Sequence, residues 1–585
     1  MNQEWNLEVI YTGFDDPRFS EDMKSLAAVA EHFQTLACEL SDMEPLEGLR
    51  EGVACMEAMQ NLAMKTAQYA DLRQSTNSRD SQAGSQFGRV LAILSNTAAP
   101  EAAFRAWAAG LPNLMELVAE DEALSEYRFL FENMAEDRRY LLEGKGEEIM
   151  AKMNLSGSSA WEQLHSHLTS TVPVTYRGEK TNLPGIRNLA YDPDPDVRRE
   201  AYEAELACYE RIEDSAAYCL NSIKMETLTD CALRGYDSPL DRTLKQAHMK
   251  AETLQAMLGA MDEYMPHFRR YLKAKAKALG HENGLPWYDL FAPMGSSSTT
   301  FTTEQARDYL VERFRGFDPE LAEMVGRAFD EAWIDFYPHD GKRGGAFCSG
   351  LLPGLGQSRI LTNFGDTFSD VITLAHELGH AFHNNCIKDH LPLNQEYSMP
   401  LAETASTFNE CIINNAALAS AADDSERLTI LESSLQDVTQ IIVDIYSRFR
   451  FEDEVIRRRE QEFMDGATLC DIMTRAQKAS YGDGLDENVM HKYMWVCKSH
   501  YYGPTYYNFP YAFGGLFARG LYAQYEKEGA AFVPKYKKLL NTTTVATAED
   551  TAKVAGIDLT DKDFWRSALQ TVADQIDRFC ALVEA

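Results

Sequence analysis

Apolar residues recur at spacings of three and four along most of this chain, which is the periodicity of amphipathic helices. The segments 20–40 and 249–279 show it clearly, and both are rich in Ala, Leu, Met, Glu and Lys, which favour helix. Stretches at 74–86, 191–204 and 292–305 interrupt the pattern. The first is polar and predicts a turn, the second predicts a turn followed by a helix start, and the third is a Ser/Thr-rich loop that leads into another capped helix. The sequence therefore predicts a mainly α protein.

The region 341–364 departs from the helical pattern. It is rich in glycine and contains the β-branched and aromatic stretch RILTNF at 359–364. We predict a small β-sheet of two or more strands here. Directly after it, Thr367 and Asp370 have the spacing of a capping box, which predicts the start of a helix.

The segment SDVITLAHELGHAFHN at 369–384 predicts a helix with two different faces. One face is an apolar stripe made by Val371, Leu374, Ala375, Leu378 and Phe382. At about 100° per residue, His376, His380 and His383 fall on roughly the opposite side. His383 is either a hydrogen-bond donor behind the other two histidines or an ordinary core histidine, and the sequence leaves both open.

Charge and cysteine content restrict the class of protein. The chain has 56 basic and 90 acidic residues and a formal charge of −34, so it would repel the phosphates of nucleic acids. Its 11 cysteines are odd in number and include no Cys-x-x-Cys pair, which argues against a disulfide framework or a zinc ribbon. Free thiols favour a reducing compartment, and we expect a cytoplasmic location. The N-terminus is polar and acidic, and no run of about 18 apolar residues occurs, so we expect neither a signal peptide nor a membrane span.

The spacing of the histidines suits a metal ion. His376 and His380 are four residues apart, so their imidazoles are neighbours on one helix face. Such a pair can fill two corners of the tetrahedron that zinc prefers, and Glu377 beside them can reach a metal-bound water. This His-Glu-x-x-His arrangement on a helix is typical of metallopeptidases. The alternative is a helix with ordinary surface or core histidines.

A catalytic zinc ion needs a third protein ligand. Downstream, SMPLAETASTFNECIINNA at 398–416 predicts a second helix, with Glu403 near its N-terminus, where a carboxylate is favoured. We predict that Glu403 is the third ligand, although a solvated glutamate is the alternative. Glu410, two turns further on, is better suited to orient a histidine ligand. Glu396 competes with Glu403 but lies in a less regular segment.

Eight stretches follow one another along the chain: EWNLEVIYTGFDDPRF, NLAYDPDPDVRREAYEA, RGYDSPLD, WYDLFAPM, GKRGGAFCSG, RILTNF, DVITLAHELGHAFH and LAETASTFNE. Together they resemble the oligoendopeptidase F and thimet oligopeptidase family of zinc metallopeptidases, particularly its bacterial oligoendopeptidase branch. The resemblance implies a two-lobed helical fold around a deep channel, with one zinc ion on the channel floor. It implies short unfolded peptides, cut internally, as substrates. We expect a helical N-terminal lobe over 1–200 and a catalytic region over 201–585 with its His-Glu-x-x-His helix at 370–384.

The stretch KSHYYGPTYYNFPYAFGGLFARGLY at 498–522 is also similar to that family. The resemblance implies that a histidine and nearby tyrosines contact the scissile peptide bond; His500 matches the histidine, and Tyr507 and Tyr511 are the best matches for the tyrosines. Some relatives carry a tyrosine where this chain has Gly515, so the division of roles between the phenols stays open. The alternative for each tyrosine is packing in a core helix.

These residues together predict a mechanism. With zinc held by the three ligands above, Glu377 would act as general base for the water that attacks the peptide carbonyl. The oxyanion would be stabilised by zinc, by His500 and by Tyr507 or Tyr511. The segment GGAF at 344–347 would be a sheet edge to which the peptide adds as a strand, or else a plain hairpin turn.

Two other functions remain open at this point. A metallo-exopeptidase on a related scaffold would need a fixed charge to hold a peptide terminus, and no such residue is identifiable from the sequence. A non-catalytic peptide-binding protein would carry a vestigial site, which the intact set of His376, Glu377 and His380 argues against. The cleavage preference, the natural substrate and the oligomeric state cannot be predicted from the sequence.

Overall fold

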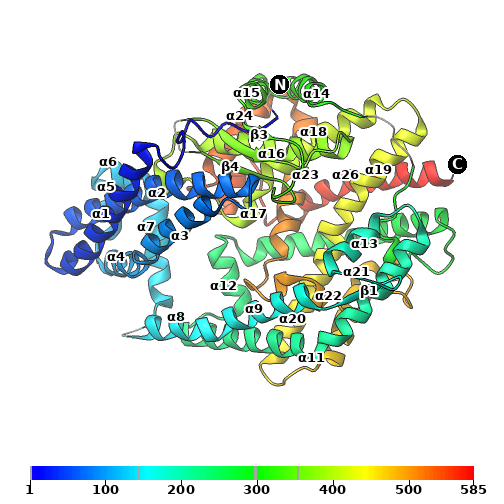
Figure 1. Cartoon of the computed structure of the whole chain (residues 1–585), viewed down its shortest axis with the longest axis horizontal. Helices are drawn as coiled ribbons and strands as arrows, with labels where there is room; N and C mark the ends of the chain where they lie inside the picture. Colours follow the sequence, from blue (N-terminus) through cyan, green and yellow to red (C-terminus); the bar gives the residue numbers. More distant parts are fainter. Residues whose placement is uncertain (1–2, 143–144, 296–299, 352–354, 585) are drawn as a thin grey trace.

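The computed structural model describes residues 3–142, 145–295, 300–351 and 355–584. Helices make up most of the chain, which confirms the predicted mainly α class (Figure 1). The helices predicted at 20–40 and 249–279 are α1 (Pro17–Glu39) and α13 (Ala251–Ala278). Within the described residues, no helix is both long enough and apolar enough to cross a membrane.

The three predicted interruptions precede capped helices. The helices that follow them are α3 (Ser81–Ser95), α11 (Pro195–Arg234) and α14 (Thr303–Arg315). Asp80 and Asp194 cap the first two by accepting hydrogen bonds from backbone N–H groups of the first turn, and Thr302 forms a capping box with Gln305. Residues 296–299 of the third interruption lie outside the described residues.

A first group of helices has a core of its own and forms the left side of Figure 1. Besides α1 it contains α2 (Pro45–Thr76), α4 (Ala98–Gly110), α5 (Leu114–Glu120), α6 (Glu122–Glu126) and α7 (Arg128–Asp137). Phe33, Phe104 and Phe131 are fully buried in that core. The small residue Gly52 of α2 lets the Phe104 ring lie against the helix backbone.

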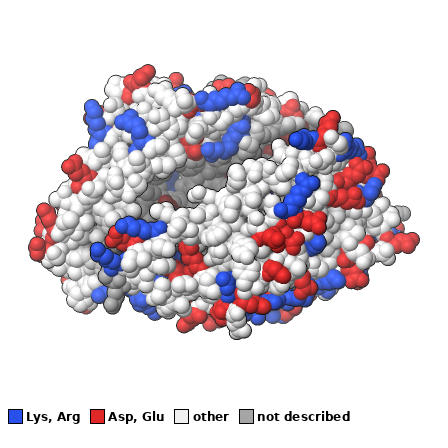
Figure 2. All heavy atoms as spheres, turned by 60° about the horizontal axis from the view of Figure 1, so that its bottom comes forward, with Lys and Arg blue, Asp and Glu red and all other residues white. Residues whose placement is uncertain are grey.

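Two lobes face each other in the rest of the molecule (Figure 1). The lower one contains α11 together with α8 (Gly146–Ser156), α9 (Ser158–Thr171), α12 (Pro239–Gln246) and α20 (Ile445–Arg459). The upper one contains α16 (Phe368–Ile387), α17 (Met399–Ala402), α18 (Thr404–Ser420) and α23 (Phe509–Glu528). Figure 2 shows that the surface between the lobes is hollowed. The predicted boundary at residue 200 falls inside the continuous helix α11 and stays a prediction.

The predicted small sheet is present beside α16. Its strands are β3 (Ile334–Asp335), β4 (Phe347–Gly350) and β5 (Ser358–Leu361). The order is β3-β5-β4, with β3 parallel and β4 antiparallel to β5, so β4 lies at an edge. A second hairpin, β1 (Val174–Tyr176) and β2 (Glu179–Thr181), was not expected, because strands of three residues are too short to give a readable alternation.

The helix α16 begins where the capping box predicts. The backbone N–H of Thr367 donates to Asp370 Oδ2 at 2.9 Å, and that of Asp370 donates to Thr367 Oγ1 at 3.3 Å. Its apolar stripe, including Val371, Leu374 and Leu378, has no exposed surface. Burial of this stripe fixes the rotation of the helix and turns the histidine face toward the neighbouring helix α18.

Candidate metal centre

His376 and His380 lie side by side on α16. Their ring centroids are 4.9 Å apart and the rings are nearly perpendicular. The two side chains are 26% and 17% exposed, so both imidazoles are mostly buried but still reachable from solvent. This geometry follows from the spacing of four residues, because one helical turn separates the two.

Glu403 completes the group from a second helical segment. Its Oε2 lies 3.3 Å from His376 Nε2 and 3.5 Å from His380 Nε2. The prediction of one continuous helix over 398–416 was wrong: α17 ends at Ala402, α18 begins at Thr404, and Glu403 stands between them. Its backbone has φ −88° and ψ 7°. Because this ψ lies outside the helical range, the Glu403 side chain does not follow the direction set by α17 or α18.

The spacing of the three ligand atoms suits a tetrahedral metal ion. They all lie within 4.8 Å of one another. A zinc ion with bonds of about 2.0–2.1 Å to nitrogen and oxygen has ligand atoms about 3.4 Å apart. The Glu403 oxygen meets that separation to both imidazole nitrogens. Two neutral imidazoles and one carboxylate are also a donor set that catalytic zinc accepts. Glu396 is not part of this group.

Glu410 lies behind His376, on the side of the ring away from Glu403. Its Oε1 is 2.5 Å from His376 Nδ1, which leaves Nε2 of that ring facing Glu403. Burial lowers the pKa of His376, but the hydrogen bonds with Glu403 and Glu410 outweigh it and raise the pKa to about 10. For His380, burial and then the charge of His376 lower the pKa to about 4. The effect on His376 shows that Glu403 and Glu410 concentrate negative charge where a cation would bind.

Glu377 is the most buried carboxyl group of the centre, at 6% exposure. Burial raises its pKa to about 7, the positive charge of His376 opposes this, and the negative charges of Glu403 and Glu410 add to it. Cys348 of β4 lies close enough for the charge of Glu377 to act on it, and burial raises the pKa of that thiol. The edge strand therefore runs next to the Glu377 side of the helix.

A glycine allows the ligands to meet. An added Cβ at Gly379 would lie 2.5 Å from both Ala405 O and Ser406 Cα of α18. Any side chain here would hold the two helices apart, so Gly379 sets the separation across which His376 and His380 reach Glu403. Gly379 was not among the residues predicted from the sequence. A glycine between two ligands on a buried helix, where alanine would favour helix more, was the signal that could have found it.

His383 does not belong to the metal centre. It is fully buried, its Nε2 is 2.8 Å from Thr543 Oγ1, and its ring stacks on Tyr397 with centroids 4.1 Å apart. Burial lowers its pKa to about 3. Of the two possibilities left open by the sequence, the structure places it as a core histidine.

His500, Tyr507 and Tyr511 form one aromatic cluster. The His500 ring lies 5.6 Å from that of Tyr507 and 5.9 Å from that of Tyr511, and the two phenol rings are 5.8 Å apart. His500 Nδ1 is buried without a hydrogen-bond partner in the described part of the chain. Burial, and then the charges of Arg448 and Lys498, lower the pKa of His500 to about 4, so the ring is neutral at pH 7.

The helix α23 connects this cluster to the metal centre. An added Cβ at Gly514 would lie 2.8 Å from Glu403 Cβ, so α23 packs directly on Glu403. Tyr511 lies one turn before Gly514 on the same face. At Gly515 an added Cβ would meet Ile441 Cδ1 at 2.3 Å, so the space beside this position is already filled by packing.

The edge strand β4 has free backbone groups. Leu351 N–H donates to Gln357 O at the end of the β4–β5 ladder. Because antiparallel pairs alternate, Cys348 and Gly350 direct their N–H and C=O groups away from β5. Gly350 O accepts a hydrogen bond from Gln68 Nε2 of α2, at 2.5 Å. The edge thus begins at Phe347, and the predicted segment 344–347 leads into it rather than forming it.

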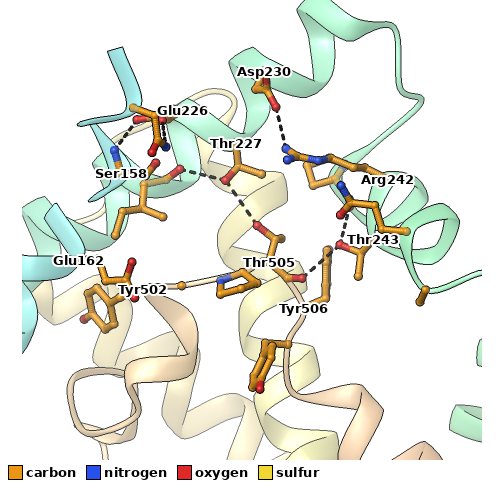
Figure 3. Close-up of a pocket in the computed structure, with 18 of the residues that line it drawn as sticks. Ser158, Glu162, Glu226, Thr227, Asp230, Arg242, Thr243, Tyr502, Thr505 and Tyr506 are labelled. Atoms are coloured by element: carbon orange, nitrogen blue, oxygen red, sulfur yellow. Dashed lines mark hydrogen bonds and ion pairs between the residues drawn. The ribbon is translucent and has the colours of Figure 1, made fainter. Parts of the chain in front are cut away.

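A cavity of about 680 Å³ opens beside the aromatic cluster (Figure 3). Its lining includes residues of α8, α9, α11 and α12 from the lower lobe, and Met399, Pro400 and Tyr507 from the side of the metal centre. Two arginines of the lining are engaged by carboxylates: Arg234 pairs with Glu147 and Asp230, and Arg242 pairs with Asp230. This cavity could not be predicted from the sequence, because segments far apart in the chain line it.

A helical two-lobed fold with a His-Glu-x-x-His helix and a glutamate beside it, at the start of a later helix, is typical of a metallopeptidase. The sequence profile of peptidase family M3 matches residues 188–571, and the profile of the oligopeptidase F N-terminal region matches residues 111–172. The chain therefore belongs to peptidase family M3 and is a metalloendopeptidase of that zinc-dependent family.

Several proteins of similar sequence agree with this class. The chain is 26% identical to group B oligopeptidase PepB of Streptococcus agalactiae over 77% of this chain and 76% of that protein. It is 25% identical to oligopeptidase PepF of Bacillus subtilis over 79% and 70% of the two chains. The crystal structure of oligoendopeptidase-F from Enterococcus faecium superimposes with a TM-score of 0.72 at 18% identity, over 97% of this chain and 99% of that one. That structure supports the fold.

The crossing at Gly379 gives a first prediction. In Gly379→Ala, α16 and α18 have to separate, which moves the histidines away from Glu403. We expect zinc affinity to fall about 10- to 100-fold and stability to fall by about 1–3 kcal/mol. Zinc titration and thermal unfolding measure the two effects. In the matched control Gly326→Ala, also in a helix, α15 (Pro319–Asp330), the nearest atom to the new Cβ is 4.0 Å away. That variant should bind zinc normally, and equal zinc affinity in both variants would contradict the prediction.

Proposed function

We propose that this protein is a zinc-dependent endopeptidase that hydrolyses internal peptide bonds of short unfolded oligopeptides. The observation that carries the proposal is that Glu403 Oε2 lies 3.3 Å from His376 Nε2 and 3.5 Å from His380 Nε2, with the ligand atoms of all three residues within 4.8 Å of one another. These three residues would hold the zinc ion. When bound, zinc supplies an acidified water near neutral pH and polarises the scissile carbonyl.

Glu377 is proposed as the general base. It follows a ligand on the same helix, and its buried carboxyl has a pKa of about 7 because of desolvation. A nearby divalent cation would lower this value and favour the carboxylate, which can take a proton from the attacking water. The same carboxyl group can then pass the proton to the leaving amine. One side chain can carry out both proton transfers if it reaches the attacking water and the leaving amine.

The aromatic cluster is proposed to stabilise the oxyanion. Burial, and then a hydrogen bond with Tyr507, raise the pKa of Tyr511 above its usual value, so this phenol keeps its proton and can donate it in a hydrogen bond. His500 is neutral at pH 7 and can donate from one ring nitrogen. Either Tyr507 or Tyr511 would be the phenol that contacts the oxyanion.

The edge strand β4 is proposed to hold the peptide backbone. The outward N–H and C=O of Cys348 can pair with an extended peptide, as strand addition requires. Gln68 fills the next acceptor, Gly350 O, and so marks one end of the free edge. A peptide bound this way must be extended. An unfolded oligopeptide can adopt that conformation, whereas a folded protein would have to unfold first.

An exopeptidase is less well supported. It needs a cation or an anion free to pair with a peptide terminus. Arg234 and Arg242, the arginines of the cavity beside the aromatic cluster, are both engaged by carboxylates. A non-catalytic peptide-binding protein would not need Glu410 behind His376, because orienting an imidazole serves metal binding.

The base assignment is tested by Glu377→Gln. The variant keeps the shape of the side chain but cannot accept a proton, so we expect kcat to fall by about 10²–10⁴-fold. Zinc content should stay at one ion per chain, because Glu377 is not a proposed ligand. A quenched fluorescent peptide and elemental analysis measure the two. Brisk cleavage by Glu377→Gln would rule out this role.

The role of Glu410 is tested by a pair of variants. Glu410→Ala leaves His376 Nδ1 without its acceptor and should weaken zinc binding about 10- to 100-fold. Glu410→Gln retains an oxygen at that position and should lose less. Competition with a chelator measures both affinities. Equal affinities in the parent and in Glu410→Ala would show that the hydrogen bond does not orient the ligand.

The proposed endopeptidase activity is tested with a peptide whose N-terminus is acetylated and whose C-terminus is amidated. We expect it to be cleaved at the same internal bond and at a similar rate as the free peptide, because no terminal charge is recognised. Mass spectrometry of the products identifies the bond. Loss of cleavage on blocking either terminus would favour an exopeptidase.

A further inference from the structure

The segment 503–507, which leads from the His500 region to Tyr507, has an unusual backbone. Tyr506 has a φ of +57°, in the left-handed region. That region is unfavourable for a bulky aromatic residue, so the surroundings must hold it there. The ring of Tyr506 is not free to relax, because the residue is only 2% exposed.

A buried ion pair contacts this backbone. The N–H of Tyr506 donates to Glu452 Oε1 of α20 at 3.0 Å. The same oxygen accepts a hydrogen bond from Lys224 Nζ of α11 at 2.7 Å. Neither the Lys224 nor the Glu452 side chain has any exposed surface. A carboxylate removed from water is a strong acceptor for a backbone N–H, so this contact fixes the peptide plane that precedes Tyr506, while the buried ring of Tyr506 fixes the other side of its N–Cα bond.

Stability alone does not account for the pair. Glu452 Oε2 is buried and has no hydrogen-bond partner within the described ranges. Buried polar atoms are nearly always paired, so such an exception needs an explanation. Two apolar residues of similar size would often be as stable as a buried ion pair. They could not, however, accept the hydrogen bond from Tyr506.

Further contacts tie Thr505 and Tyr506 to the lower lobe (Figure 3). Thr243 Oγ1 of α12 donates to Thr505 O at 3.1 Å, and the hydroxyls of Thr227 and Thr505 are 3.4 Å apart. The phenol of Tyr506 donates to Asp453 Oδ1 at 3.0 Å. Helices α11, α12 and α20 thus fix residues 505 and 506 from three sides.

Tyr507 follows directly after the left-handed residue. A return of Tyr506 to an ordinary φ would rotate the chain by more than about 100° and carry the phenol of Tyr507 away from His500. We propose that the buried Lys224–Glu452 ion pair is a positioning device: it holds Tyr506 in its left-handed conformation and thereby aims the Tyr507 phenol at the scissile carbonyl. This inference rests on the proposed function, and it assigns the oxyanion contact to Tyr507.

The first test removes the acceptor without leaving a buried charge. In Lys224→Met/Glu452→Met we expect kcat to fall about 100-fold, with KM and zinc content nearly unchanged. In the matched variant Lys224→Met/Glu452→Gln the amide oxygen still accepts from Tyr506 N–H, so most of kcat should return. Equal kcat in these two double variants would overturn the proposal.

A second buried pair provides a control for the loss of charge. Lys275 of α13 and Glu432 of α19 (Asp424–Thr439) form an ion pair of similar burial, but their further hydrogen bonds go to Leu290 and Tyr271. Lys275→Met/Glu432→Met should therefore keep the parent kcat. A 100-fold loss here as well would show that any buried pair has this effect, and would overturn the positioning role.

The third test separates positioning from a structural role. Because the pair acts through the Tyr507 phenol, Lys224→Met/Glu452→Met should lower kcat little further when combined with Tyr507→Phe. Multiplied losses in the combined variant would overturn the proposal. Full kcat in Tyr507→Phe alone would also overturn it, while the peptidase assignment, which Glu377→Gln tests, would stand.

A backbone substitution covers the case in which the double variants do not fold. Replacing Tyr506 by its α-hydroxy analogue exchanges the N–H for an ester oxygen and leaves Lys224 and Glu452 in place. We expect the same loss of kcat at unchanged KM. Parent-like kcat in this folded ester variant would overturn the proposal.

Discussion

The close crossing of α16 and α18 is the constraint on which the rest of the site depends. An imidazole on one helix and a carboxylate on another can share a metal ion only if the two backbones nearly touch. Gly379 permits this, because an added Cβ would lie 2.5 Å from Ala405 O. Asn409 Nδ2 of α18 also donates to Ala375 O of α16 at 3.1 Å, which fixes the helices along their length. Packing against α23 at Gly514 then holds Glu403 from the other side.

The charges around this crossing are arranged for a cation. Three carboxyl groups, Glu377, Glu403 and Glu410, surround two imidazoles in a partly buried place. Removing carboxylates from water is costly unless positive charge compensates them. Protonation of His376, with its pKa near 10, provides that compensation for the bare side chains. A divalent ion would provide more, and would also release the histidine proton, since zinc binds neutral imidazole.

Each of the two lobes contributes to the proposed reaction centre. The upper lobe supplies the ligands, the proposed base and the edge strand β4. The aromatic cluster belongs to segment 500–511, whose central part is tied to α11, α12 and α20 of the lower lobe. Figure 2 shows a hollow surface between these lobes.

The sequence by itself determined the helical class, the small sheet, the start of α16, and the pair His376 and His380, because these follow from periodicity and spacing within one element. It also indicated Glu403 and Glu410, through their position on a following helix, although it missed the break at Glu403 itself. A break of one residue leaves no mark in an apolar pattern whose period is more than three residues.

Only the tertiary structure decided which distant segments meet. It placed Gly379 against α18 and the phenol cluster beside Glu403 through α23. It also separated His383 from His376 and His380, although all three follow the same helical spacing. The physical reason is that periodicity gives the direction of a side chain relative to its own helix. The partner in that direction depends on how closely other helices can pack, and that is set by residues elsewhere in the chain.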